Sequence, residues 1–250
     1  MRLALAAMIS GKGDLERNLD RHIEVLRGAA ADRCDVGVFP EFSLTGSVDP
    51  AHAPQHLVTI TDDRVERLVA ATKSTGVAAV FGIGERAPDG PYITQVVARD
   101  GELVGVQRKR HLGEGEESYA VGAADASFAV GSTRFAIAIC AESGIDRPWD
   151  AAAAADARLV LMCSAPGLHG RRTTEPEWHK GLAWWESCGL ADARRHAARL
   201  HLWVAMATQA GSTHDEDFPG LAALIDPNGE VVARTADWHP GTLLFDVPPG

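Results

Sequence analysis

Short apolar runs alternate with amphipathic segments along the first third of the chain. Residues 2–9, 35–39 and 77–83 each form such a run, which is typical of a buried strand. Between the first two runs, Asp14 is a good N-cap residue, and apolar residues follow it at helical spacing. These apolar residues are Leu15, Leu19, Ile23 and Leu26. A helix is therefore predicted to connect the first two strands.

A second helix is predicted between the second and third strands. Asp62 and Asp63 favour its start, because acidic residues suit the N-terminal turn of a helix. Gly76 stands where a left-handed C-terminal cap belongs. The apolar residues between them share one helical face, at Val65, Leu68 and Val69.

Hairpins and further strand–helix pairs fill the rest of the chain. Asp100-Gly101 and the segment 226–229 are turn signals, each between two strand-like segments. The flanking segments are 92–98, 103–107, 221–225 and 231–234. Further strands are predicted at 134–139, 159–162, 201–208 and 242–247, and helices at 150–157 and within 175–200. This order predicts an α/β fold with sheets inside and helices outside. Since no Ser/Gly-rich linker divides the chain, we expect one domain, 1–250.

Composition and charge narrow the class of protein. Hydrophobic residues make up 46% of the 250 residues and charged residues 23%, which is ample for a packed core. The formal net charge of −10 argues against a nucleic-acid partner, since phosphate binding needs a basic patch. No apolar stretch approaches the ~18–20 residues of a membrane span. The run at 2–9 is interpreted as a buried first strand rather than a signal peptide, and a cytoplasmic location is expected.

Several motifs that would indicate a cofactor or a metal are incomplete. The four cysteines include no CxxC pair, so a zinc ribbon is not expected. We expect free thiols in a reducing compartment. Gly82-Ile-Gly84 follows a strand, but no helix pattern follows it to cradle a phosphate. His52 and His56 have i, i+4 spacing, but Pro54 between them disfavours a helix. We therefore expect neither a metal nor an organic cofactor.

Three chemically active residues each stand at or just after the end of a predicted strand. They are Glu41, Lys109 and Cys140. A thiol is a weak nucleophile at neutral pH unless a base removes its proton or a cation stabilises the thiolate. A carboxylate can do the first and an ammonium the second. The ends of three strands could therefore bring a complete nucleophilic site into one cleft.

The same three segments carry a family resemblance that spans nearly the whole chain. The sequence resembles the nitrilase superfamily of carbon–nitrogen hydrolases, which use a Glu–Lys–Cys triad. The stretches that match its motifs are GDLERNLDRHIE, VGVFPEFSLTG, GELVGVQRKRHL, FAIAICAESG and FPGLAALIDPNGEVVA. Four positions depart from the family pattern. The family commonly has an aromatic residue at the positions of Gln107 and Ala141, Asp at that of Glu142, and Asn at that of Thr94. These departures concern the substrate more than the chemistry.

The resemblance implies a role for each residue of the triad. Glu41 would be the general base, Cys140 the nucleophile, and Lys109 an oxyanion stabiliser together with the backbone N–H of Ala141. Family members commonly carry a second glutamate that orients the lysine. The spacing from Lys109 favours Glu116, with Glu117 next and Glu114 also available.

Further substrate contacts are proposed near these motifs. The candidates are Glu117, Glu142, Cys163 and Ser164. For Cys163, a buried thiol in the core is the favoured interpretation. For Glu142, the alternative is a residue that only ends a strand. Walls of the pocket are expected from the loops 113–121, 144–150 and 167–178. The tryptophans 178, 184 and 185 fit packing or a subunit interface.

The resemblance also implies a fold, an activity and a partner. The fold would be a four-layer α-β-β-α sandwich, and a homodimer or larger homo-oligomer is expected. The favoured function is hydrolysis of a non-peptide C–N bond in a small linear amide, through a cysteine thioester. The alternatives are hydrolysis of a nitrile, of an N-carbamoyl amino acid or of the ω-amide of a 2-oxo acid, and transfer of the acyl group to an amine. A regulatory member without turnover and a metal-dependent hydrolase are competing classes.

Overall fold

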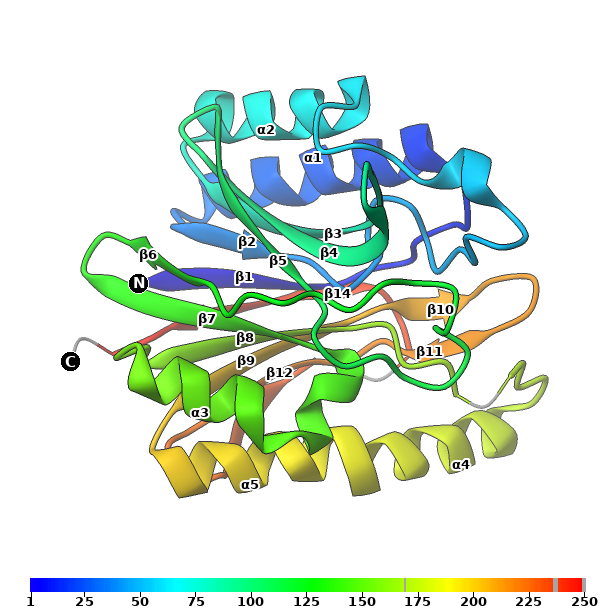
Figure 1. The fold of residues 1–250 in the computed structure, drawn as a ribbon. Helices are drawn as coiled ribbons and strands as arrows, with labels where there is room; N and C mark the ends of the chain where they lie inside the picture. Colours follow the sequence, from blue (N-terminus) through cyan, green and yellow to red (C-terminus); the bar gives the residue numbers. More distant parts are fainter. Residues whose placement is uncertain (169, 236–237, 249–250) are drawn as a thin grey trace.

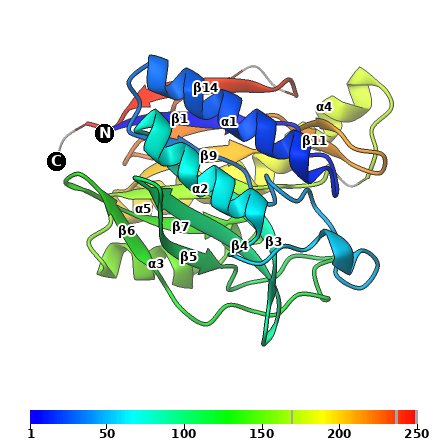
Figure 2. The ribbon, with the colours of Figure 1, turned by 90° about the horizontal axis from the view of Figure 1, so that it is seen from above.

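Two sheets lie face to face in the centre of the molecule, and helices cover both outer faces (Figure 1). The structure is a computed structural model, and it describes residues 1–168, 170–235 and 238–248. The helices α1 (Leu15–Ala31) and α2 (Asp63–Thr75) lie side by side over the first sheet (Figure 2). On the opposite side, α3 (Asp146–Ala154), α4 (Glu175–Trp185) and α5 (Ala191–Leu200) cover the second sheet. The predicted four-layer α-β-β-α sandwich is confirmed.

The first sheet has six strands in the order β14-β1-β2-β3-β4-β5. Their bounds are Gly241–Asp246, Arg2–Ala7, Val36–Val38, Ala78–Ala87, Gly90–Arg99 and Glu102–Arg108. The first three strands of the chain pair in parallel, whereas β3, β4 and β5 form antiparallel hairpins. The apolar run at 2–9 therefore supplies β1, which pairs with strands on both sides.

The second sheet has six strands in the order β13-β12-β9-β8-β7-β6. Their bounds are Val231–Arg234, Ala222–Ile225, Trp203–Thr208, Leu159–Ser164, Thr133–Ile139 and Ser127–Val130. The three central strands β7, β8 and β9 are parallel. A separate short hairpin joins β10 (Ala210–Ser212) to β11 (Asp217–Pro219).

The central strands are buried on both faces, which explains their nearly continuous apolar sequences. In β1, Leu3 and Leu5 pack between the two sheets, whereas Ala4 and Ala6 pack beneath α1 and α2. Strands β7 and β8 show the same alternation between the core that separates the sheets and the core beneath the outer helices. No helix in the described ranges has the length and apolar character needed to cross a bilayer.

The end signals of α2 act as predicted. The Asp62 side chain accepts a hydrogen bond from the backbone N–H of Arg64, and Gly76 adopts a left-handed conformation with φ of 70°. Asp14 precedes α1 as expected, but its side chain makes no capping hydrogen bond within the described chain. Capping from a side chain therefore contributes to α2 and not to α1.

The structure corrects several predicted elements. The helix expected at 150–157 is α3, which starts earlier, at Asp146, because Pro148 is tolerated in a first helical turn. The region 175–200 is two helices joined by a π-helical turn, Glu186–Leu190. Gly189 permits this turn, since a Cβ there would lie 2.1 Å from the Trp185 ring. Strands β6, β10 and β11 were not predicted, because three or four residues carry too little pattern.

Candidate active site

Glu41 lies in a tight turn directly after β2, packed against β3. The Ser43 hydroxyl of this turn accepts a hydrogen bond from the backbone N–H of Gly82 at 2.9 Å. A Cβ on Gly82 would lie 2.3 Å from the backbone nitrogen of Phe42. The first glycine of Gly82-Ile-Gly84 therefore allows the strand to approach the turn that carries Glu41, and it does not belong to a phosphate-binding loop.

The Glu41 carboxylate is fully buried and fixed from two directions. Its Oε1 accepts a hydrogen bond from Lys109 Nζ at 2.7 Å, and its Oε2 accepts one from the backbone N–H of Ala165 at 2.9 Å. The Gln209 side chain donates to the Glu41 carbonyl oxygen at 3.1 Å. Contacts from both sheets therefore hold this carboxylate in one position.

Lys109 follows β5, and its side chain is fully buried between two carboxylates. Besides Glu41, the Lys109 ammonium contacts Glu116 Oε1 at 2.6 Å. Glu116 Oε2 in turn accepts a hydrogen bond from the backbone N–H of Gly113 at 2.6 Å. Of the three candidate glutamates, Glu116 is thus the one in contact with Lys109. Glu117 is exposed and accepts from the backbone of its own loop.

Cys140 begins a 3₁₀ turn, Cys140–Gly144, at the end of β7. Its φ of 43° is left-handed, which costs a non-glycine residue about 1–3 kcal/mol and is common at functional sites. Both Cys140 and Ala141 line a cavity, so the start of this turn lies beside a space that can hold a ligand. The turn presents the thiol much as a nucleophile elbow does, without the flanking glycines.

The charges of these residues act on one another. Burial raises the pKa of Glu41 to about 7, although the nearby Lys109 ammonium opposes this rise. Burial and the charge of Glu41 raise the pKa of the Cys140 thiol well above its ordinary value, with Lys109 acting in the opposite direction. Burial lowers the pKa of Lys109, but Glu41, Cys140 and Glu116 outweigh it, so the pKa of Lys109 is raised. The site therefore holds a neutral thiol beside a titratable carboxyl group and a stable cation.

The cavity has a volume of about 940 Å³, which suits a small organic molecule. Loops that follow strands of both sheets form its wall, together with the 3₁₀ turn, the end of α4 and the π-helical turn. They come from 47–56, 113–119, 140–143, 165–167, 184–189 and 214–216, together with Lys12, Phe42 and Gly170. Lys12 lies 2.7 Å from both Asp215 and Glu216, which connects the segment before α1 to the β10–β11 hairpin.

The structure does not bring four predicted substrate contacts to this cavity. Cys163 is fully buried in the core between the sheets, because it continues the alternation of Leu159 and Leu161 in β8. Burial raises the pKa of its thiol further above the ordinary value. Ser164 and Glu142 are also fully buried and absent from the lining, and Glu117 points to solvent. None of these four residues belongs to the cavity wall. Glu41 and Lys109 are absent from the wall as well, whereas Glu116, which contacts Lys109, belongs to it.

The predicted pocket loops are partly right. The loops 113–121 and 167–178 contribute to the wall, whereas 144–150 is mostly taken up by α3. Sequence analysis missed the segment 47–56 and the β10–β11 hairpin. The hydroxyl of Tyr119, in the predicted loop 113–121, donates to the Val48 carbonyl oxygen at 2.6 Å and so joins this loop to the segment 47–56. Irregular loops carry no periodic signal, so only the fold reveals these contributions. No group of three metal-binding side chains is found in the part of the chain that the structure describes.

Comparison with known proteins defines the class. The family model of carbon–nitrogen hydrolases matches residues 2–250, and the chain belongs to this family. The predicted family is confirmed.

Among solved structures, the amidase from Nesterenkonia sp. AN1 superposes with a TM-score of 0.82 at 22% identity, covering 99% of this chain and 93% of that one. Among curated relatives, a glutamine-dependent NAD(+) synthetase of Thermotoga maritima is 25% identical over 93% of this chain and 39% of its own length. An aliphatic nitrilase of Rhodococcus rhodochrous is 30% identical over 38% of this chain and 30% of its length. The chain thus spans less than half of these curated relatives.

Proposed function

We propose that the protein is a thiol amidohydrolase that cleaves the C–N bond of a small linear amide through a thioester on Cys140. The observation that carries this proposal is the placement of the Lys109 ammonium between Glu41 and Glu116, close enough to Cys140, at the wall of a cavity, for the two groups to shift each other's pKa. A base, a cation and a thiol are the three groups that acyl transfer to sulfur requires.

The first half of the reaction forms a thioester. Glu41 takes the proton of the Cys140 thiol as the sulfur attacks the amide carbonyl carbon. Negative charge then develops on the substrate oxygen, where Lys109 and the backbone N–H of Ala141 stabilise it. Each such donor is worth about 3–4 kcal/mol in comparable sites. Glu41 returns the proton to the departing ammonia or amine.

The second half restores the enzyme. Glu41 accepts a proton from a water molecule, which attacks the thioester carbon, and the acid product leaves with Cys140 protonated again. Glu116 keeps the Lys109 ammonium aimed at the reacting oxygen. A pKa near 7 suits Glu41 for both halves, because a group that must accept and return protons works best near the operating pH.

Relatives support the amide class. Two structures of the Nesterenkonia amidase carry covalent adducts on its active-site cysteine, one from acrylamide and one from fluoroacetamide. An (R)-stereoselective amidase of a Pseudomonas species is 29% identical over 47% of this chain. The aliphatic nitrilase keeps nitrile hydrolysis as an alternative with the same three residues.

The side-chain amide of glutamine is a second candidate substrate. It is favoured by the Thermotoga NAD(+) synthetase, which matches 93% of this chain and is glutamine-dependent. Glutamine would be cleaved through the same thioester on Cys140. The cavity would in addition have to bind the α-amino and α-carboxylate groups of the substrate.

Ammonia release tests the function. Purified protein is incubated with short aliphatic amides, glutamine, N-carbamoyl amino acids and aliphatic nitriles. We expect release from amides, its loss in Cys140→Ala, and its retention in the matched variant Cys34→Ala, whose thiol is buried away from the cavity. Absence of turnover on every substrate, without an acyl adduct on Cys140, would indicate a binding member of the family.

A further inference from the structure

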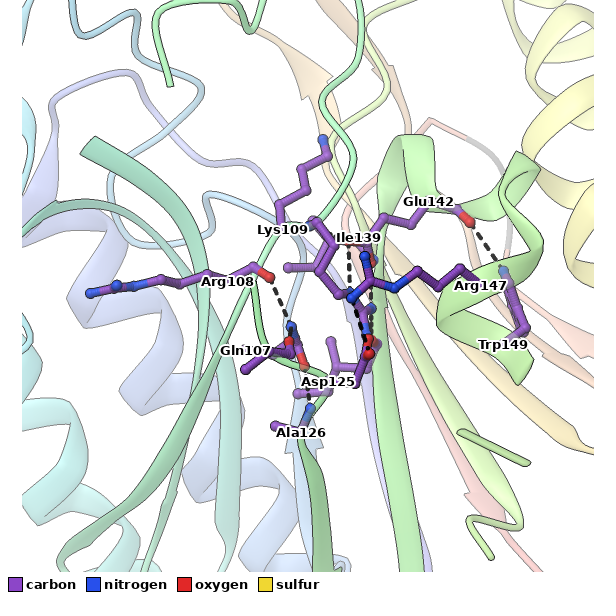
Figure 3. A network of polar contacts seen from close by, with 12 residues as sticks. Gln107, Arg108, Lys109, Asp125, Ala126, Ile139, Glu142, Arg147 and Trp149 are labelled. Carbon is purple, nitrogen blue, oxygen red and sulfur yellow. Dashed lines mark hydrogen bonds and ion pairs between the residues drawn. The ribbon is translucent and has the colours of Figure 1, made fainter. Parts of the chain in front are cut away.

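A second buried charge cluster is centred on Glu142, in the turn Cys140–Gly144 that carries the proposed nucleophile (the nucleophile turn). Its carboxylate is fully buried and forms an ion pair with Arg110, at 2.6 Å between Oε2 and Nη2. Arg110 Nε also donates to Oε1 at 3.1 Å. Figure 3 shows that Lys109 points away from this cluster, although it is the residue next to Arg110.

We propose that Glu142 is a positioning residue that holds the nucleophile turn in register with the segment that carries Lys109. The proposal rests on the proposed thioester chemistry, because it concerns the geometry of the same sulfur and the same ammonium. It assigns Glu142 no contact with substrate, because Arg110 and the backbone N–H of Ile139 occupy both oxygens of its carboxylate.

On the cysteine side, Glu142 fixes the backbone before and after Cys140. Its Oε2 accepts a hydrogen bond from the backbone N–H of Ile139 at 2.9 Å, so the side chain reaches back across the nucleophile. The Glu142 carbonyl oxygen accepts from the indole N–H of Trp149 at 3.0 Å, which ties the turn to α3 (Figure 3). Left-handed backbone at a non-glycine residue persists only where its surroundings enforce it, and these bonds enforce it at Cys140.

On the lysine side, Glu142 fixes the backbone directly after Lys109. Its Oε1 accepts a hydrogen bond from the backbone N–H of Arg110. The Arg110 guanidinium also donates to the Ile137 carbonyl oxygen of β7 at 2.7 Å. One carboxylate therefore touches the residue before the nucleophile and the residue after the cation. Since Lys109 and Cys140 come from different sheets, this link is a direct determinant of their separation.

The ion pair of Glu142 belongs to a larger network of charges. Arg110 faces two carboxylates, because its Nη1 also donates to Asp125 at 2.9 Å. Asp125 in turn lies 3.4 Å from the more exposed Arg147. A buried ion pair is weak evidence for stability, since apolar residues of similar size are often as stable. The benefit specific to this arrangement is that a rigid guanidinium fork and a carboxylate define one geometry.

The test compares Glu142→Gln with Glu142→Asp and with the control Glu85→Gln. Glu85 is also buried and also paired with an arginine that neighbours Lys109, but its carboxylate bonds Arg108 and Thr94 and not the nucleophile turn. Two quantities are measured: kcat and KM on a cleaved amide, and the rate of Cys140 alkylation by iodoacetamide, which needs no substrate.

Displacement of a reacting group by 1 Å can cost about a hundredfold in rate. We expect Glu142→Gln to lower kcat about 10- to 100-fold with KM within about threefold, and to lower the alkylation rate as well. Glu142→Asp, which restores the charge, should recover part of both rates, and Glu85→Gln should leave both near wild type.

An unchanged alkylation rate and kcat in folded Glu142→Gln, or an equal loss in Glu85→Gln, would overturn the proposal. Should Glu142→Gln fail to fold, Arg110→Lys provides the same test, because lysine keeps the charge but cannot bridge Glu142, Asp125 and the Ile137 carbonyl oxygen together. Failure of the proposed function is distinguishable: wild-type protein would then cleave no amide, whereas the alkylation comparison would still report on Glu142.

Discussion

Lys109 and Arg110 are neighbours in sequence, both buried, and each lies between two carboxylates. Their surroundings differ in one respect. The lysine cluster, formed with Glu41 and Glu116, adjoins the cavity, whereas the arginine cluster, formed with Glu142 and Asp125, lies behind the nucleophile turn. In the roles proposed above, the lysine cluster takes part in the chemistry, and the arginine cluster holds the geometry of the turn.

The choice of cation fits each setting. Arginine presents a rigid fork that stays protonated, which suits a fixed structural link. Lysine is a compact point charge that can stabilise an oxyanion and modulate the pKa of its neighbours. Burial raises the pKa of Glu41 to about 7, so that a proton can be gained and lost within the lysine cluster.

The largest contrast is expected between one carboxylate from each cluster. Glu41→Gln should lower kcat/KM by about 10²- to 10⁴-fold, because it removes the general base. Asp125→Asn should stay within about twofold, since Asp125 is partly exposed and contacts Arg110 and Arg147 rather than the turn that carries Cys140. Steady-state kinetics on one amide measure both. Equal losses would mean that the two clusters do not have separate roles.

Removal of the lysine charge should have the next largest effect. Lys109→Gln should lower kcat by about 10²- to 10³-fold, the usual cost of one oxyanion donor. It should also slow alkylation of Cys140 at neutral pH, because the ammonium opposes the rise in the pKa of the thiol. Alkylation at the wild-type rate would mean that Lys109 does not influence the Cys140 thiol.

The pH dependence should report on Glu41. The base must be ionised to accept a proton, and its pKa is raised to about 7. Activity should therefore be high above pH 7 and fall about tenfold per pH unit below it. In Lys109→Gln, this acidic limb should move to higher pH, because the cation that lowers the pKa of Glu41 is lost. A rate that stays constant down to pH 5 would argue against Glu41 as the base.

The smallest effect is expected for a thiol outside both clusters. Cys163→Ala should change kcat/KM by less than about twofold and lower the free energy of unfolding by about 1 kcal/mol, because it leaves a small void between the sheets. Urea unfolding and steady-state kinetics measure the two quantities. A large loss of kcat/KM with an unchanged free energy of unfolding would indicate that Cys163 contacts the substrate.

Sequence reasoning located the parts of the site that strands define. Glu41, Lys109 and Cys140 each stand at or just after the end of a predicted strand, and the family resemblance assigned their roles. The resemblance also implied a second glutamate, and among the three candidates the spacing from Lys109 favoured Glu116, which contacts Lys109. The layers were likewise predictable, since strands buried on both faces leave nearly continuous apolar runs.

The rest depended on three-dimensional contacts without a local signal. The alternation in β8 decides that Cys163 faces the core, and a one-residue shift in that register would have reversed it. Glu142 was predicted as a substrate contact because it stands next to the site, but the partner that defines its role, Arg110, lies far away in the sequence. The segment 47–56 has no periodicity, so its place on the cavity wall followed only from the fold.

The most direct test of the account is the intact mass of the protein during turnover. The reaction with a small aliphatic amide is stopped in acid at short times, and the adduct is located by peptide mapping. We predict a transient mass gain equal to the acyl group, on Cys140 alone, that accumulates and then disappears and is absent from Cys140→Ala. Hydrolysis that continues in Cys140→Ala, or an acyl group located on another residue, would contradict the account.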